Sequence, residues 1–201
     1  MNFSSKLLED AVGEFSRLPG IGEKTALRMV LFLLNREEHD IERFCGTLLK
    51  LRKEVNFCKE CGNISDAPLC SICTSAKRDR SLICVVEDSR DVMAIENTQQ
   101  YNGLYHVLGG LISPMDGVGP SDLNIPPLVE RAANGVTAEI ILALNATMEG
   151  DTTIFYLARK LRETSVRLSA IARGIAFGGE IEYADEITLG RSIMTRVPYQ
   201  G

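Results

Sequence analysis

The feature that most constrains this chain is a set of four cysteines with the spacing C-x2-C-x8-C-x2-C, namely Cys58, Cys61, Cys70 and Cys73. Each C-x2-C pair can form a tight turn whose thiolates face one ion, and four thiolates complete a closed tetrahedral zinc site. The surrounding segment, 57–80, is too short to bury a core, so metal ligation must supply its folding free energy. The spacing therefore predicts one structural Zn²⁺ per chain. Free or redox-active thiols are the alternative interpretation.

The rest of the composition is typical of a globular protein of 201 residues, with 45% hydrophobic and 24% charged residues. The N-terminus lacks a basic start followed by an apolar stretch, and the longest apolar run, 29–34, is too short to span a bilayer. We therefore expect a cytoplasmic protein without membrane contact, where reducing conditions keep thiols available for metal. Cys45 lies in an apolar helix context and Cys84 in an apolar strand context, so we expect both in the core.

The charge is distributed unevenly along the chain. Residues 1–80 carry 13 Lys and Arg against 12 Asp and Glu, whereas residues 81–201 carry 9 against 15. The overall charge of −5 is not typical of a nucleic-acid-binding protein. Any phosphate-binding surface is therefore expected in the N-terminal part.

The first 34 residues predict two helices joined by a sharp turn. Leu8, Val12, Phe15 and Leu18 follow the spacing of an amphipathic helix, which the sequence PGIG at 19–22 interrupts. A second helix is expected over 23–34. Because its last turns, MVLFLL, are apolar on every side, that helix must be covered on more than one face, in part by another chain.

The turn between these helices has the pattern of a helix-hairpin-helix. Gly20 and Gly22 allow the backbone to turn sharply, and the N–H groups that begin the second helix can receive a DNA phosphate without reading a base. Lys24 and Arg28 lie one turn apart and would add positive charge. The alternative is a glycine-rich link between two packed helices.

Beyond the cysteines, apolar strand patterns alternate with helical ones. This order predicts an α/β fold with a parallel, doubly wound sheet. A Gly/Pro-rich loop is expected at 109–127. The expected strands are 82–87, 104–108, 138–144 and 166–171, and the expected helices are 89–97, 127–134 and 151–163.

Acidic residues follow two of the predicted strands, at Glu87 and Asp88 and within the run 145–151. Ligands of open parallel sheets collect beyond the carboxyl ends of the strands, and carboxylates there favour Mg²⁺. The alternative is a solvated acidic edge that holds no ion.

In this order the features resemble the bacterial RecR family of recombination mediators, and the resemblance extends over the whole chain. Besides the four cysteines, it rests on the segments LPGIGEKTA (18–26), VVED (85–88), VLGGLISPMDGVGP (107–120), ALNATMEGD (143–151) and ARGIAFGGEIEYAD (172–185).

The resemblance implies four parts. They are a helix-hairpin-helix at 1–56, a small C4 zinc finger at 57–80, a Toprim domain with a Rossmann-like parallel sheet at 81–175, and a C-terminal Walker-B-like and oligomerisation segment at 176–201. It also implies a nucleoid-associated DNA-binding protein that forms a ring-shaped homotetramer and acts with RecF and RecO to load RecA.

The Toprim resemblance does not extend to the complete catalytic site. Catalytic Toprim domains carry a glutamate after the first strand and a D-x-D after a later one. Glu87 fills the first role, but Asn145 and Thr147 stand at the D-x-D positions. With these carboxylates missing, we expect no phosphoryl transfer, although Glu87, Glu149 and Asp151 are candidates for weak Mg²⁺ binding. The Walker-B-like segment has no G-x4-G-K-[ST] loop to accompany it, so ATP hydrolysis is not expected.

Three functions fit these observations. The first is a non-enzymatic, sequence-nonspecific DNA-binding recombination mediator. The second is a Mg²⁺-dependent Toprim nuclease or primase-like enzyme, which the residues at positions 145 and 147 disfavour. The third is a protein-only interaction module, which salt-dependent DNA binding would exclude.

Overall fold

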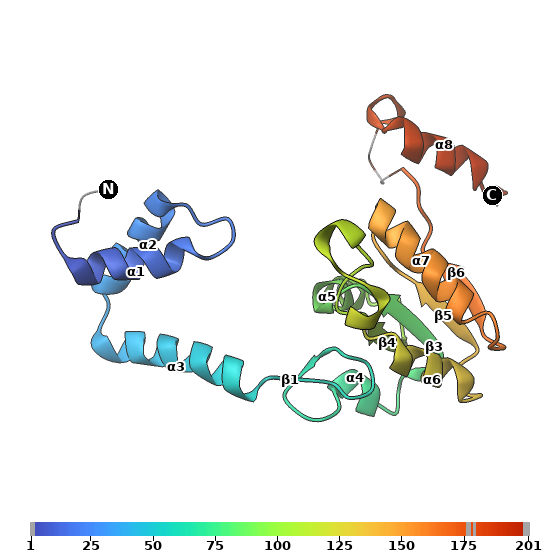
Figure 1. Ribbon diagram of the computed structural model, residues 1–201, viewed down its shortest axis with the longest axis horizontal. Helices are drawn as coiled ribbons and strands as arrows, with labels where there is room; N and C mark the ends of the chain where they lie inside the picture. The colour runs from blue at the N-terminus through green and yellow to red at the C-terminus, as the bar shows by residue number, and fades with distance from the viewer. Residues whose placement is uncertain (1–2, 176–177, 179, 199–201) are drawn as a thin grey trace. The chain divides into compact units, whose positions relative to one another are not determined.

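The computed structural model describes residues 3–175, 178 and 180–198. By its internal contacts the chain divides into two compact units, Met1–Val55 and Asn56–Gly201. They are called the N-terminal and C-terminal units below, and each is described by itself (Figure 1).

The N-terminal unit consists of three helices, α1 (Lys6–Ser16), α2 (Glu23–Leu34) and α3 (Glu38–Glu54). The first begins where the Ser5 hydroxyl accepts a hydrogen bond from the backbone of the first turn. As predicted, α1 and α2 pack against each other across the glycine turn. Their shared core is small and consists of Val12, Ala26 and Val30.

A helix is expected around Cys45, and the third helix, which contains it, has no buried residue. The expectation that Cys45 lies in the core is therefore wrong, because this residue of α3 is exposed. Leu48, Leu49 and Leu51 of the same helix are exposed as well. A unit of 55 residues cannot enclose the apolar surfaces of three helices at once.

The C-terminal unit begins with the cysteine segment. Two short antiparallel strands, β1 (Asn56–Phe57) and β2 (Ile64–Ser65), carry the first cysteine pair between them. A single helical turn, α4 (Ser71–Thr74), follows the third cysteine and includes the fourth.

The predicted parallel sheet is confirmed. Its strands are β3 (Asp79–Val86), β4 (Gly103–Val107), β5 (Glu139–Leu142) and β6 (Arg167–Ala170). They lie in the order β4-β3-β5-β6, and every neighbouring pair is parallel.

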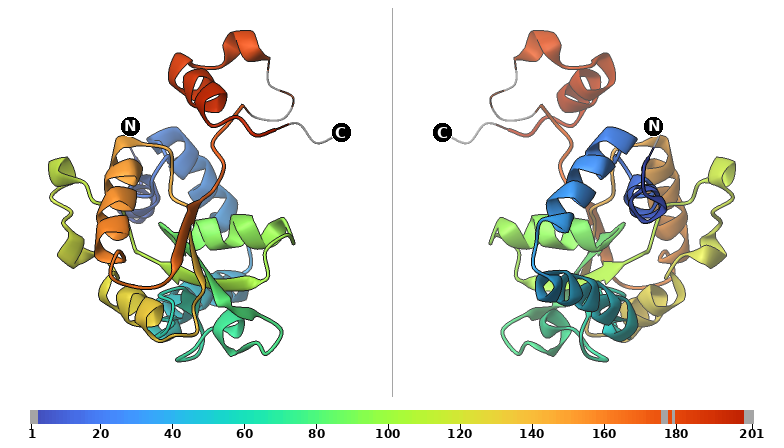
Figure 2. Two further views of the ribbon diagram at one scale, coloured as in Figure 1. Left: turned by 90° about the vertical axis from the view of Figure 1, so that its right-hand side faces the viewer. Right: turned by 90° about the vertical axis from the view of Figure 1, so that its left-hand side faces the viewer.

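Helices cover both faces of the sheet (Figure 2). On β3, Cys84 and Val86 face the core beneath α5 (Ser89–Asn97), and so Cys84 is buried as predicted. Ile83 and Val85 face the opposite core, beneath α6 (Pro126–Ala133) and α7 (Met148–Lys160). This alternation is the period of two that a buried central strand requires.

Helix α7 begins three residues before the predicted position 151, because the Thr147 hydroxyl accepts a hydrogen bond from the Gly150 amide and caps the helix. The connection from β4 to α6 contains two short 3₁₀ turns, η1 (Pro114–Asp116) and η2 (Pro120–Asp122). After β6 the chain forms η3 (Ile181–Tyr183) and α8 (Glu186–Met194), which the sequence pattern did not predict. In the described part of the chain, no helix combines the length and apolarity needed to cross a bilayer.

The cysteine segment is docked onto the sheet through its backbone. The Val107 amide at the end of β4 donates a 2.7 Å hydrogen bond to the Cys61 carbonyl oxygen. Ile72 of α4 packs against the cysteine cluster and against the cores on both faces of the sheet. A Cβ atom added to Gly62 would lie 2.7 Å from Asn124 Nδ2 and 2.9 Å from the Val107 carbonyl oxygen, so only glycine permits this approach.

We predict that Gly62→Ala destabilises the C-terminal unit more than Gly117→Ala does. Both glycines have left-handed backbones, with φ of 75° and 73°, but an added Cβ at Gly117 meets nothing within 4 Å. The Gly117→Ala control should therefore lower the free energy of unfolding only by the conformational cost of a left-handed alanine, about 1 kcal/mol. Gly62→Ala should lower it by about 1–3 kcal/mol more, because its Cβ would clash. Chemical denaturation measures both losses, and equal losses would show that the docking contact is unimportant.

Candidate zinc centre and DNA-binding surface

The four predicted ligands lie together in one cluster. All four cysteines are at most 4% exposed, and their sulfur atoms lie within 4.8 Å of one another. The Cys61 and Cys70 sulfurs are 3.6 Å apart. A tetrahedral site with Zn–S bonds of about 2.3 Å requires sulfur atoms about 3.8 Å apart, so the cluster fits zinc.

Backbone groups orient these sulfurs. The Cys70 amide donates to the Cys58 sulfur at 3.3 Å, and the Cys73 amide donates to the Cys70 sulfur at 3.5 Å. The first pair is held in a turn in which the Gly62 amide donates to the Cys58 carbonyl oxygen at 2.8 Å. The ligands are therefore prearranged by the fold of the finger.

The acidity of the thiols shows why the cluster needs a cation. A hydrogen bond from the Cys73 thiol lowers the pKa of Cys61 to about 6, and the same bond raises the pKa of Cys73. Burial raises the pKa of Cys70. Once one thiol has ionised, burial and like charge oppose ionisation of its neighbours. A bound Zn²⁺ supplies the positive charge that allows four thiolates to coexist.

A buried arginine joins the finger to the sheet, and sequence reasoning missed it. Arg131 of α6 donates to the Tyr105 carbonyl oxygen at 2.7 Å, and its second terminal nitrogen, which has no hydrogen-bond partner, lies 3.8 Å from a carboxylate oxygen of Glu60. Glu60 stands between the first two cysteines and also lies 4.0 Å from Arg80. The one sequence signal is an arginine within an apolar helical stretch.

Next to this arginine, His106 of β4 is completely buried. Burial lowers its pKa to about 4, so the imidazole is neutral at physiological pH. Its Nε2 contacts the Asn124 carbonyl oxygen and its Nδ1 lies 3.4 Å from the Arg131 guanidinium. A neutral ring donating from Nε2 and accepting at Nδ1 satisfies both contacts, and so His106 supports the docked finger.

The structure forms the predicted hairpin turn with the named glycines. Gly20 has φ of 76°, a left-handed conformation that favours glycine, and Gly22 is the N-cap of α2. No side chain caps the amides of the first turn of α2. Lys24 and Arg28 are exposed, and neither forms an ion pair within residues 3–55. A helix start that no side chain caps and two cations without an ion pair among residues 3–55 thus lie on one short stretch of α2.

At the carboxyl ends of the strands, two of the three candidate magnesium carboxylates, Glu87 and Asp151, already have side-chain partners. The Asn145 side-chain amide donates to a Glu87 carboxylate oxygen at 2.8 Å. Asp151 forms ion pairs with Arg173 and Arg191, which lower the pKa of its carboxyl group. Among the described residues, the four cysteines are the one group of three or more metal-ligand side chains close enough to hold an ion. Weak Mg²⁺ binding at Glu87, Glu149 and Asp151 stays a prediction.

Comparison with known families matches four consecutive parts of the chain. The matches are to the RecR helix-hairpin-helix (residues 8–51), the RecR four-cysteine zinc finger domain (55–75), the Toprim domain (81–172) and the RecR C-terminal family (174–197). The recombination protein RecR of Bacteroides thetaiotaomicron is 61% identical over 199 residues, which cover 99% of this chain and 97% of the relative. Those of Cytophaga hutchinsonii and Flavobacterium psychrophilum are 58% and 56% identical over 100% of this chain and over 98% and 97% of their own lengths. This chain belongs to the RecR family.

The family assignment and the geometry agree on the metal. The RecR zinc-finger match contains all four cysteines, and their sulfurs have the spacing that zinc requires. Cys58, Cys61, Cys70 and Cys73 are therefore the ligands of one structural zinc ion.

We predict that Cys61→Ser reduces the zinc content from one ion per chain to nearly none and lowers the thermal midpoint by at least about 5 °C, because the finger has no core to replace the metal. Cys45→Ser is the matched control, since this exposed thiol lies outside the cluster and its loss should change neither value. A Cys61→Ser protein that lacks zinc but melts like the wild type would contradict this prediction.

Proposed function

We propose that this RecR-family chain is a DNA-binding recombination mediator without enzymatic activity of its own. The observation that carries the proposal is the uncapped start of α2 beside Lys24 and Arg28, in a chain in which Asn145 and Thr147 stand where a catalytic Toprim site needs carboxylates. In this function the protein binds DNA and supports the assembly of other proteins on it.

The hairpin supports contact with the phosphate backbone of DNA. Backbone N–H groups at a helix start attract anions, and the turn formed by Gly20 and Gly22 presents them without a side chain in the way. Lys24 and Arg28 extend this positive surface along α2. Since none of these groups reads a base edge, the binding would be sequence-nonspecific and would weaken steeply with salt.

The Toprim edge supports a binding role rather than catalysis. Metal-assisted phosphoryl transfer needs carboxylates free to hold Mg²⁺ against the phosphate. Here Asn145 hydrogen-bonds to the one glutamate at the expected position, and arginines engage Asp151. Any magnesium held by Glu87, Glu149 and Asp151 would have to displace these partners, so the nuclease or primase-like alternative is disfavoured.

The relatives are named recombination proteins, and we extend that role to this chain. The proposed partners are RecF and RecO, with which the protein would help to load RecA on DNA in the nucleoid region of the cytoplasm. Membership of the RecR family supports these proposed partners.

Self-association is part of the proposal, with a homotetramer as the expected form. The exposed fractions of Leu31, Phe32 and Leu34 on α2 are 42%, 56% and 75%. Phe32 and Leu34 line apolar hollows together with Phe44 of α3, and burying this surface against a second copy would stabilise both chains. A ring would also concentrate the scarce positive charge of the N-terminal parts around DNA.

We predict that Lys24→Glu with Arg28→Glu weakens binding to every DNA sequence by about tenfold or more at low salt, because two phosphate contacts become repulsive. Lys53→Glu with Lys50→Glu is the matched control, since it makes the same charge change on α3. Fluorescence anisotropy at several salt concentrations measures the affinity. Equal losses in both variants would mean that only net charge matters and that the hairpin is structural.

We predict that the purified protein with Mg²⁺ neither cuts, relaxes nor primes DNA. The reason is the replacement of two expected carboxylates by Asn145 and Thr147. Gel assays on supercoiled and primed templates test this, with Glu87→Gln as the control variant. Turnover that this substitution abolishes would promote the enzymatic alternative.

We predict that the wild type is oligomeric at tens of micromolar and that Leu31→Glu with Leu34→Glu shifts it toward smaller species, since charges are introduced on the exposed apolar face of α2. Light scattering reports the mass with and without DNA. A wild type that is monomeric under both conditions would refute this part of the proposal.

A further inference from the structure

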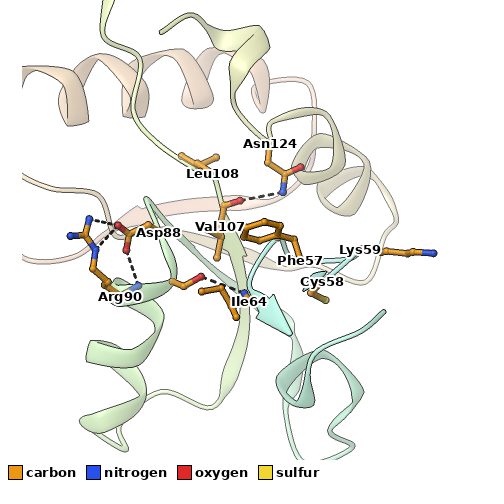
Figure 3. A pocket seen from close by; sticks show the side chains of 12 residues that line it. Phe57, Cys58, Lys59, Ile64, Asp88, Arg90, Val107, Leu108 and Asn124 are labelled. Atoms are coloured by element: carbon orange, nitrogen blue, oxygen red, sulfur yellow. Dashed lines mark hydrogen bonds and ion pairs between the residues drawn. The ribbon is translucent and has the colours of Figure 1, made fainter. Parts of the chain in front are cut away.

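A pocket of about 670 Å³ lies between the zinc finger and the carboxyl ends of β3 and β4, entirely within the C-terminal unit (Figure 3). This volume is within the range of about 300–1,000 Å³ that is usual for small-ligand sites. Its walls come from β1, β2, the start of α5 and the segment that follows β4. Of the zinc ligands only Cys58 lines it, and the hairpin contributes no residue to it.

An exposed aromatic ring stands in this pocket. Phe57 of β1 is 70% exposed, although a phenyl ring gains free energy by leaving water. Its backbone is fixed by pairing with Ile64 of β2, which is 46% exposed and lines the same pocket. The buried Val107 and Leu108 form an apolar floor beneath them. The zinc finger thus holds the Phe57 ring exposed to solvent at the pocket.

The charges around this ring lie at the rim. In Figure 3 the side chains of Lys59 and Arg90 lie on opposite sides of the pocket and point outward. Arg90 pairs with Asp88, whereas Lys59 has no ion pair within residues 3–175. The positive charge of Lys59, which has no counter-ion among these residues, therefore lies at the rim of the pocket.

A phosphate is not the group that the interior of the pocket accommodates. The amides at the start of α5 already donate to carboxylates, because Asp88 accepts from the Arg90 amide and Asp91 accepts from the Asp88 amide. An anion would meet these carboxylates instead of free N–H groups. The interior therefore favours a flat neutral group, and only the rim favours a negative one.

We propose that this pocket receives an unstacked base of single-stranded DNA, which stacks on the ring of Phe57 while Lys59 and Arg90 contact the flanking phosphates. A base is flat and neutral, and the phosphates on either side of its nucleotide would lie outside the pocket, beside Lys59 and Arg90. This inference rests on the proposed DNA-binding function and extends it. Because the hairpin binds backbone only, the stacked base would add a preference for single strands over duplexes.

The test compares two labelled oligonucleotides of equal length, oligo-dT and a fully abasic strand with the same phosphates. The wild type should bind oligo-dT about tenfold more tightly, since stacking requires the base. Phe57→Ala should remove this difference and leave the affinity for the abasic strand unchanged, and Phe57→Tyr should restore the difference. Lys59→Gln should weaken binding to both strands.

Phe155→Ala is the matched control, because Phe155 of α7 is 71% exposed but lies outside the pocket. It should bind both strands like the wild type. If Phe57→Ala keeps the wild-type preference for oligo-dT, or if the wild type has none, the inference is wrong and the pocket is left for a protein side chain. If the wild type binds neither strand nor duplex DNA, the proposed function fails as well.

Discussion

The ligation of one zinc ion by four thiolates is the interaction on which the arrangement of the C-terminal unit depends. The finger has two-residue strands and one helical turn, so metal ligation must supply most of the free energy that holds its chain together. With the cysteines fixed, the Cys61 carbonyl oxygen accepts from the end of β4, and Ile72 enters the cores on both faces of the sheet. Zinc thereby also determines where Phe57 and Lys59 lie.

The docking of the finger is electrostatic as well as apolar. Arg131 is buried with one hydrogen bond to the sheet and an ion pair to Glu60, and the neutral His106 accepts from the same guanidinium. A buried arginine is costly unless its charge is balanced, so removing Glu60 would leave an uncompensated charge beneath the finger. The finger and the sheet therefore form one cooperative unit.

At the carboxyl ends of the strands, carboxylates that could hold a metal ion form structural contacts with other side chains instead. Where catalytic Toprim domains place carboxylates, Asn145 donates to Glu87. Arg173 and Arg191 pair with a second acid of this edge, Asp151, and tie the chain after β6 and helix α8 to α7. These contacts stabilise the edge of the sheet, and a metal ion would have to compete with them for the same carboxylates.

Much of this could be predicted from the sequence, because the signals are local or periodic. The cysteine spacing predicted the zinc site. Apolar strand patterns that alternate with helical patterns predicted every strand of the parallel sheet. The burial of Cys45 was predicted wrongly, since apolar residues on a helix do not reveal whether the unit can cover them. The roles of Arg131 and His106 depend on contacts between residues far apart in the sequence, and the place of Arg131 in an apolar helical stretch does not reveal its partners.

The most direct test of the central claim is native mass spectrometry of the full chain with a short duplex and Mg²⁺. The account predicts an oligomer that carries one zinc per subunit and binds DNA whose mass is unchanged after prolonged incubation. Detection of a zinc-free folded chain, of no DNA-bound species, or of cleaved DNA would contradict it.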